Sequence, residues 1–217
     1  MTIKIGDTLP EGTLAEFIET ETEGCALGPN TFNVQDLAKG KKIAIFGLPG
    51  AFTPTCSAQH VPGYVQHAEA LKAAGVDEIW CISVNDAFVM GAWGRDQKAT
   101  GIVRMMGDGN AAYSKALGLD ADFSKHGMGT RSQRYSLLAD NGVVTQLNIE
   151  QGGKFEVSNA ETLLGQLKLC LILRHLLDYA LRANPTYDKK NGAFAGAIFY
   201  CTTGFLASNS AASISKE

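Results

Sequence analysis

The chain has 217 residues, of which 45% are hydrophobic and 19% charged, and its formal net charge is −3. This composition is ordinary for a globular protein and is long enough to bury a substantial core. The small negative charge gives no electrostatic basis for binding nucleic acid or an anionic membrane surface. The first residues, MTIKIGDTLPEG, lack a basic region followed by a long apolar core, so we expect no secretory signal.

The cysteines are odd in number and contain no C-x-x-C pair, which argues against a zinc framework or a secreted disulfide scaffold. They stand at Cys25, Cys56, Cys81, Cys170 and Cys201. We therefore expect a reducing compartment, the cytoplasm. No dinucleotide, flavin or metal motif is present, and we expect no cofactor.

The N-terminal part of the chain predicts one edge of a sheet. Glycine and proline punctuate residues 4–17, which favours a strand or a hairpin. Cys25 lies in the polar stretch GCALGPN, as an incidental loop cysteine or a resolving thiol. A short helix is expected at Val34–Ala38, capped by Asn33 or Thr31.

The next stretch places a cysteine at the start of a helix. Residues 43–46 are an apolar run typical of a buried strand, and a Gly/Pro-rich loop follows over 47–52. Thr53 is a suitable N-cap, and Pro54 suits the first helical position because it has no N–H to lose. Cys56 then lies in the first turn, where unpaired N–H groups and the helix dipole favour an anion such as a thiolate.

A helix end alone does not ionise a thiol at neutral pH. A free thiol with a pKa of ~8.5 is about 3% thiolate at pH 7, and lowering the pKa to ~6 requires roughly 3.4 kcal/mol. A helix terminus supplies ~0.3–2 kcal/mol, so a charge-assisted hydrogen bond of ~1.5–3 kcal/mol must be added. Thr53 is a candidate hydroxyl donor, and an arginine must come from elsewhere in the chain.

The cysteine helix should run to about Ala74, with a kink or break near Val61 because Pro62 lies inside it. His60 is four residues after Cys56 and lies on the same helix face. It is a candidate thiol-activating base or, alternatively, a packed or solvated histidine.

The rest of the chain predicts a mixed α/β sheet with helices on both faces. The expected elements are strands at 78–84 and 102–106, helices at 87–99 and 111–117, a Gly-containing loop at 118–130, a hairpin of 134–139 with 143–149 turning at Asp140-Asn141-Gly142, and a last helix from about Ala160, capped by Asn159 or Ser158.

Three segments resemble the type II branch of the peroxiredoxins in the same order. GLPGAFTPTCSAQHVPGY (47–64) carries the spacing P-x-x-x-T-x-x-C, formed by Pro49, Thr53 and Cys56, and CISVNDAFVMGAWG (81–94) and RSQRYSLLADNGVV (131–144) follow. The likeness runs from about Ile3 to Leu167. It implies a thioredoxin-like fold and a homodimer, with the 118–130 loop near the active site and the dimer contact.

The resemblance also implies an activity and a site. Such an enzyme is a thiol-specific peroxidase, which reduces hydrogen peroxide and organic hydroperoxides to water and alcohols through a cysteine sulfenic acid. Cys56 would be the nucleophile, Thr53 and the N–H groups of Thr55 and Cys56 would hold the peroxide oxygens, and Arg134 would contact the sulfur. Arg131 would then be a supporting residue or a dimer contact.

Three residues would shape the loop around the sulfur. Pro49 would shield it from water, Gly50 would permit close approach of the backbone, and Phe52 would add an apolar wall. Cys81 has two interpretations. A small cysteine in a buried strand needs no special explanation, but plant type II members have a cysteine at the matching place that assists regeneration.

The sulfenic acid must be reduced by a second thiol. Mammalian members use a resolving cysteine late in the domain, but the matching stretch here, GGKFEVSNAETLL (152–164), has none. A one-cysteine-like cycle reduced by glutathione with glutaredoxin therefore fits better, with thioredoxin acting through Cys81 as the second choice. The alternative functions are a peroxide sensor, redox relay or chaperone without fast turnover, and a cysteine hydrolase using His60.

The chain departs from the family after Leu167. We therefore divide it into a peroxiredoxin domain, 1–167, and a C-terminal extension of unknown role, 168–217. Residues 168–185 prolong the last helix, but their charged side chains argue against a membrane span, and the apolar run 193–206 is too short for one. The extension is an oligomerisation tail or a poorly ordered terminus, and we assign no catalytic role to Cys170 or Cys201.

Overall fold

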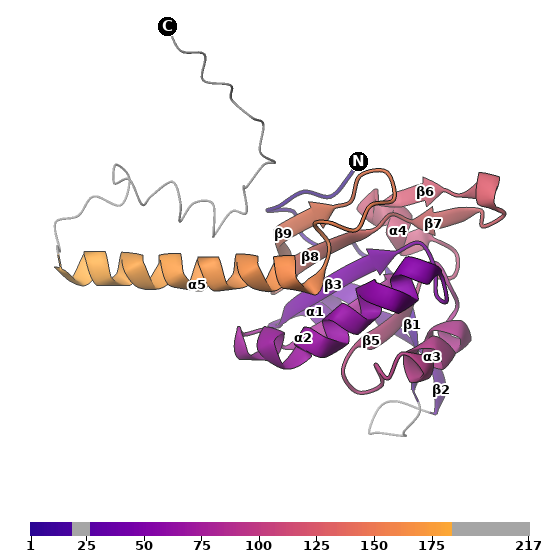
Figure 1. Cartoon of the computed structure of the whole chain (residues 1–217), viewed down its shortest axis with the longest axis horizontal. Helices are drawn as coiled ribbons and strands as arrows, with labels where there is room; N and C mark the ends of the chain where they lie inside the picture. Colours follow the sequence, from indigo (N-terminus) through magenta and orange to yellow (C-terminus); the bar gives the residue numbers. More distant parts are fainter. Residues whose placement is uncertain (19–26, 184–217) are drawn as a thin grey trace, which may run out of the picture.

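A computed structural model of the chain describes residues 1–18 and 27–183 (Figure 1). Cys25 and Cys201 lie outside this described part. Within it, a mixed sheet has the strand order β2-β1-β5-β4-β3-β8-β9, and β6 pairs with β7 in a separate ribbon. The strands are β1 (Thr13–Ile18), β2 (Gly28–Asn33), β3 (Lys42–Leu48), β4 (Glu78–Ser83), β5 (Arg104–Gly107), β6 (Asp120–Asp122), β7 (Thr130–Ser132), β8 (Tyr135–Asp140) and β9 (Val143–Ile149).

The strand before the cysteine lies in the middle of the sheet. β3 pairs in parallel with β4 and antiparallel with β8. Its side chains alternate between the two faces, with Ala44 and Phe46 in one apolar cluster and Ile43 and Ile45 in the other. Both faces are covered, which explains why the sequence of β3 is continuously apolar.

The helices cover both faces of this sheet, as predicted (Figure 1). On one face, α2 (Val61–Ala73), α3 (Ala87–Asp96) and α5 (Ala160–Ala183) pack against the cluster that contains Phe46. On the other, α1 (Val34–Ala38) and α4 (Ala112–Leu117) pack against the cluster that contains Ile45. The fold is the mixed α/β, thioredoxin-like architecture that the sequence predicts.

Two predicted helix caps are confirmed. The Asn33 side chain accepts hydrogen bonds from the backbone N–H groups of Gln35 and Asp36, and the Asn159 side chain accepts one from Thr162 N. The predicted turn between β8 and β9 is also present, with Asn141 and Gly142 both at positive φ. Local sequence chemistry therefore sets these boundaries.

The predicted loop 118–130 contains more structure than expected. It includes β6, the 3-10 helix η2 (Ser124–His126) and the start of β7. Strands of three residues carry too short a pattern to be recognised from alternation. β5 also starts later than predicted, because Ile102 N and Val103 N donate to Ala99 O in the turn after α3.

The last helix, α5, continues past Leu167 to Ala183, so the predicted prolongation is confirmed for the part that the structure describes. Among residues 1–18 and 27–183, no helix combines the length and the hydropathy that crossing a membrane requires. The apolar run 193–206 lies outside the described residues.

Candidate active site

Cys56 lies at the start of a wide helical turn directly after the loop that follows β3. The helical backbone begins at Pro54, and residues Cys56–His60 form a π-helical turn, η1, before α2 begins at Val61. The N–H of Val61 donates to the carbonyl of Cys56. The break predicted near Val61 is therefore a local π turn, a feature common at functional sites, and the helix continues beyond Pro62.

Cys56 and Arg134, which are far apart in sequence, meet in this structure. Arg134 Nη1 lies 3.4 Å from Cys56 Sγ, and both residues are buried. The register of β3 and β8 makes this possible, because Gly47 pairs with Tyr135, the residue after Arg134. A Cβ at Gly47 would collide with the Tyr135 ring, so the glycine is required for this close approach.

His60 contacts the same guanidinium nitrogen as Cys56. Arg134 Nη1 donates to His60 Nδ1 at 3.1 Å, and His60 Nε2 lies 3.2 Å from the carbonyl of Ser158. Burial, and secondarily the charge of Arg134, lowers the pKa of His60 to about 3, although the Ser158 carbonyl opposes this. His60 is therefore neutral, and the ring nitrogen facing Arg134 is already engaged, which does not fit a general base.

Glu150 organises the segment that faces His60. Its Oε1 accepts hydrogen bonds from the N–H groups of Glu156, Val157 and Ser158 and from the Ser158 hydroxyl. Burial by itself would raise the pKa of Glu150, but these hydrogen bonds outweigh it and hold the pKa below its usual value. The N–H of Glu150 also donates to the carbonyl of Arg134 at 2.9 Å. Sequence reasoning missed Glu150; its only signal was an acidic residue at the end of a predicted strand.

The loop before the cysteine is held by its own hydrogen bonds. The Thr53 hydroxyl donates to the carbonyl of Gly50 at 2.8 Å, and Ala51 N donates to the Asn85 side chain at 3.0 Å. A Cβ at Gly50 would meet Thr53 Cγ2 at 3.3 Å and Met128 Cε at 3.4 Å. The Thr53 hydroxyl hydrogen is thus used, and its oxygen lone pairs remain available as acceptors.

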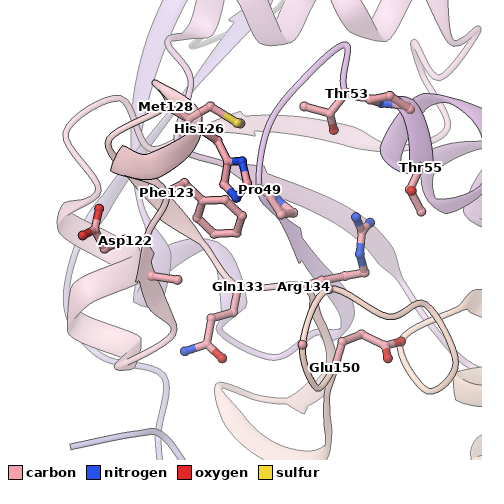
Figure 2. A pocket seen from close by; sticks show the side chains of 14 residues that line it. Pro49, Thr53, Thr55, Asp122, Phe123, His126, Met128, Gln133, Arg134 and Glu150 are labelled. Atoms are coloured by element: carbon pink, nitrogen blue, oxygen red, sulfur yellow. The ribbon is translucent and has the colours of Figure 1, made fainter.

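A cavity of about 750 Å³ opens in front of this loop (Figure 2). Figure 2 shows Phe123, His126 and Met128 on one side and Thr53, Thr55 and Arg134 on the other, with Pro49 between them. The full lining is Pro49, Thr53, Pro54, Thr55, Ala121, Asp122, Phe123, His126, Met128, Gln133, Arg134, Glu150, Gly152 and Gly153.

The two walls of this cavity differ in how far the sequence predicted them. Pro49, Thr53, Thr55 and Arg134 are predicted site residues that line it. The wall from the β6–β7 region was not predicted residue by residue, because only tertiary packing brings it there. Cys56 is fully buried and is not among the lining residues, whereas Arg134, which contacts its sulfur, is.

The other predicted residues lie around the site. Phe52 is 56% exposed, has a φ of 59° and contacts the ring of Trp93, outside the cavity lining. Arg131 donates to two backbone carbonyls, from its Nε to that of Met128 and from its Nη1 to that of Val84. Arg131 therefore ties the β6–β7 wall to the end of β4.

Cys81 lies in β4, with Phe46 as its partner in β3. Its side chain is fully buried. Burial raises the pKa of the Cys81 thiol well above its ordinary value, and the neighbouring Cys56 raises it further. Cys170, on α5, is half-buried and accepts a hydrogen bond from Gln146.

The sheet is mixed and has helices on both faces, and a cysteine at the start of a helix is paired with an arginine. This combination defines a thioredoxin-like protein with a reactive thiol. The Redoxin family model matches residues 4–164. The chain is 50% identical over 165 residues to Peroxiredoxin-2C of Oryza sativa subsp. japonica, with coverage of 76% of this chain and 98% of the relative.

Two solved structures are also similar. Reduced Prx3 of Vibrio vulnificus in complex with hydrogen peroxide is 51% identical, with a TM-score of 0.71 and coverage of 76% of this chain and 99% of that one. A Burkholderia cenocepacia protein described as a putative thioredoxin reductase is 62% identical, with a TM-score of 0.75 and coverage of 76% and 98%. The chain belongs to the Redoxin family and, within it, to the type II peroxiredoxins. Its activity is thiol-dependent reduction of peroxides.

Proposed function

We propose that the chain reduces hydrogen peroxide and organic hydroperoxides at Cys56, and that glutathione with glutaredoxin regenerates the cysteine. The observation that carries this proposal is the contact of 3.4 Å between Arg134 Nη1 and Cys56 Sγ at the start of a helical turn. A guanidinium at this distance donates to the sulfur and attracts negative charge on it and on the oxygen that leaves during the reaction.

In the first step, the Cys56 thiolate attacks one peroxide oxygen, an S–O bond forms, and the O–O bond breaks. The leaving oxygen departs as hydroxide or alkoxide and takes up a proton to give water or an alcohol. Arg134 stabilises the negative charge as it moves from sulfur to the leaving oxygen, which lowers the barrier.

Thr53 and the start of the helix position the peroxide. Since the Thr53 hydroxyl donates to Gly50, its oxygen accepts the O–H of the incoming hydroperoxide. The N–H of Ser57 donates to Thr53 O, so the N–H groups of Thr55 and Cys56 precede the first closed turn and would donate to the peroxide oxygens. Pro49 lies in the cavity lining, where it limits access of water.

The lining of the cavity supports organic hydroperoxides as substrates alongside hydrogen peroxide. Pro49, Pro54, Phe123 and Met128 contribute apolar surface, and a volume of about 750 Å³ exceeds what hydrogen peroxide alone requires. The Vibrio vulnificus relative was crystallised with hydrogen peroxide, which supports the smaller substrate.

Regeneration follows the one-cysteine route in this proposal. Glutathione attacks the Cys56 sulfenic acid, which releases water and leaves a mixed disulfide, and a second thiol, from glutaredoxin or glutathione, then frees Cys56. The burial of Cys81 and its raised pKa support this route, because a buried and protonated thiol is a poor attacking group. Thioredoxin acting through Cys81 is the second choice.

The test separates oxidation from reduction. Stopped-flow oxidation of the wild type should be fast, whereas Cys56→Ser should not react. Steady-state turnover should be supported by glutathione with glutaredoxin and be unaffected in Cys81→Ser. Turnover only with thioredoxin, and only when Cys81 is present, would overturn the proposed reductant. Fast oxidation without turnover by either reductant would favour a peroxide sensor, relay or chaperone.

We further propose that the protein is a homodimer in the cytoplasm. Exposed Phe52 and Phe88 supply apolar surface of the kind found at subunit contacts. Light scattering of the reduced protein would give twice the mass of one chain, and a monomer at micromolar concentration would refute the dimer.

A further inference from the structure

The guanidinium of Arg134 depends on one nitrogen for its placement. In the part of the chain that the structure describes, both hydrogen bonds of this side chain run through Nη1, one to Cys56 Sγ at 3.4 Å and one to His60 Nδ1 at 3.1 Å. Within the described residues, Arg134 Nε has no partner. The ring of Phe155 lies 5.7 Å from the guanidinium carbon, a contact that attracts the charge without setting its direction.

The tautomer of His60 follows from this contact. Arginine has no acceptor, so its Nη1 donates and His60 Nδ1 must accept. The proton of the neutral ring is then on Nε2, which donates to the carbonyl of Ser158 at 3.2 Å. The ring therefore presents a lone pair to Arg134 on one side and is anchored to the protein on the other.

The surroundings hold the imidazole still. It is fully buried, and its ring centroid lies 4.8 Å from that of Phe46 and 4.9 Å from that of Phe155. The Ser158 carbonyl is fixed in turn, since Glu150 accepts from the N–H and the hydroxyl of Ser158. The π turn places Cys56 and His60 at its two ends, so the sulfur and the imidazole face the same arginine nitrogen.

We propose that His60 is a positioning residue for the peroxidase reaction: its neutral Nδ1 holds the Arg134 nitrogen that contacts the Cys56 sulfur. This inference rests on the proposed function of that same site. His60 transfers no proton and touches no substrate. It acts by occupying one hydrogen of Nη1, which directs the other hydrogen of the same nitrogen at the sulfur.

Two substitutions of similar size separate the two hydrogen bonds of His60, the one accepted from Arg134 and the one donated to Ser158. The side-chain oxygen of asparagine takes about the place of Nδ1, so His60→Asn keeps the acceptor for Arg134. The amide nitrogen of glutamine takes about the place of Nε2, so His60→Gln keeps the donor to Ser158 and loses that acceptor. Tyr64→Phe is the control for the carbonyl, because the Tyr64 hydroxyl also donates to Ser158 O at 3.1 Å.

The readout is the second-order rate constant for oxidation of Cys56, measured by stopped flow in single turnover without reductant. His60→Asn and Tyr64→Phe should stay within about threefold of the wild type. His60→Gln should fall roughly 10- to 100-fold, the equivalent of one charge-assisted hydrogen bond. Equal loss in both His60 variants, no loss in either, or loss in His60→Asn alone would overturn the proposal.

A second measurement needs no variant. ¹⁵N spectra of the imidazole in the reduced wild type should report the Nε2–H tautomer and no titration of His60 between pH 5 and 8. An Nδ1–H tautomer or a charged ring would refute the contact as assigned. If the wild type itself fails to react with peroxide, the proposed function fails; if it reacts fast but the histidine results are negative, only this inference fails.

Discussion

Replacing Arg134 with methionine tests the electrostatic basis of the reaction most directly. Methionine is an unbranched apolar side chain that fills much of the same buried space, and the substitution removes the charge beside Cys56 Sγ. With an effective dielectric constant of about 20, two unit charges at 3.4 Å attract by about 5 kcal/mol. This attraction applies to the thiolate before the reaction and to the oxygen that becomes charged during it.

The rate constant reflects only the part of this attraction that is stronger in the transition state than in the reactants. Removing one preorganised donor from a developing oxyanion lowers rates by about 10²–10³. We therefore expect Arg134→Met to lower the second-order rate constant of peroxide oxidation roughly 100- to 1000-fold.

Stopped-flow fluorescence with excess peroxide measures this rate constant without any reductant. Arg104→Met is a matched control, because Arg104 is a half-buried arginine of the sheet paired with Glu16 and Glu78. It should lower stability and leave the oxidation rate of the folded protein unchanged. A rate for Arg134→Met within threefold of the wild type would refute the electrostatic argument.

Three further predictions concern the surrounding residues. Cys81→Ala should leave turnover with glutathione and glutaredoxin unchanged in a coupled assay, because the buried thiol takes no part; a loss of turnover would contradict the one-cysteine route. Thr53→Val should slow stopped-flow oxidation about tenfold or more by removing the hydroxyl, whereas Thr53→Ser should stay near the wild type; equal rates for the two variants would contradict the assigned acceptor. Glu150→Gln keeps the accepting oxygen and removes the charge. Since the pKa of Glu150 is lowered in the folded state from its usual 4.5, its contribution is present above that value and lost as pH falls through the folded pKa. The stability gap to the wild type, measured by urea denaturation, should therefore be full at pH 7 and narrow below about pH 4.5. A gap that does not change with pH would contradict this assignment.

Local chemistry determined much of the fold. The apolar run that became β3, the Asn33 and Asn159 caps, and the Asn141-Gly142 turn are all specified by neighbouring residues, and the structure confirms each. The position of Cys56 near a helix start also follows from local sequence, because proline favours the first turn. The π-helical turn at Cys56–His60 does not follow from local sequence, because five residues of π-helix have no sequence pattern of their own.

The relation of His60 to the site shows where local reasoning stops. Its spacing from Cys56 placed both on one side of the helix, which left a base for the thiol and a packed or solvated histidine as alternatives, and the packed histidine is the one confirmed. The structure turns Nδ1 to Arg134 and lowers the pKa of the ring to about 3 by burial. Burial and the identity of a hydrogen-bond partner depend on segments 74 and 98 residues away, which the spacing does not contain.

The sequence by itself determined the strand, the loop and the helix start that present Cys56, because these depend on residues within a few positions of one another. The resemblance named Arg134 and the 118–130 loop as neighbours of the sulfur, but only the tertiary structure decided how they reach it. The pairing of β3 with β8 brings Arg134 to it, and the β6–β7 region closes the cavity. Non-local contacts of this kind follow from strand register and packing, and no local pattern encodes the distance between two side chains that meet only when the sheet forms.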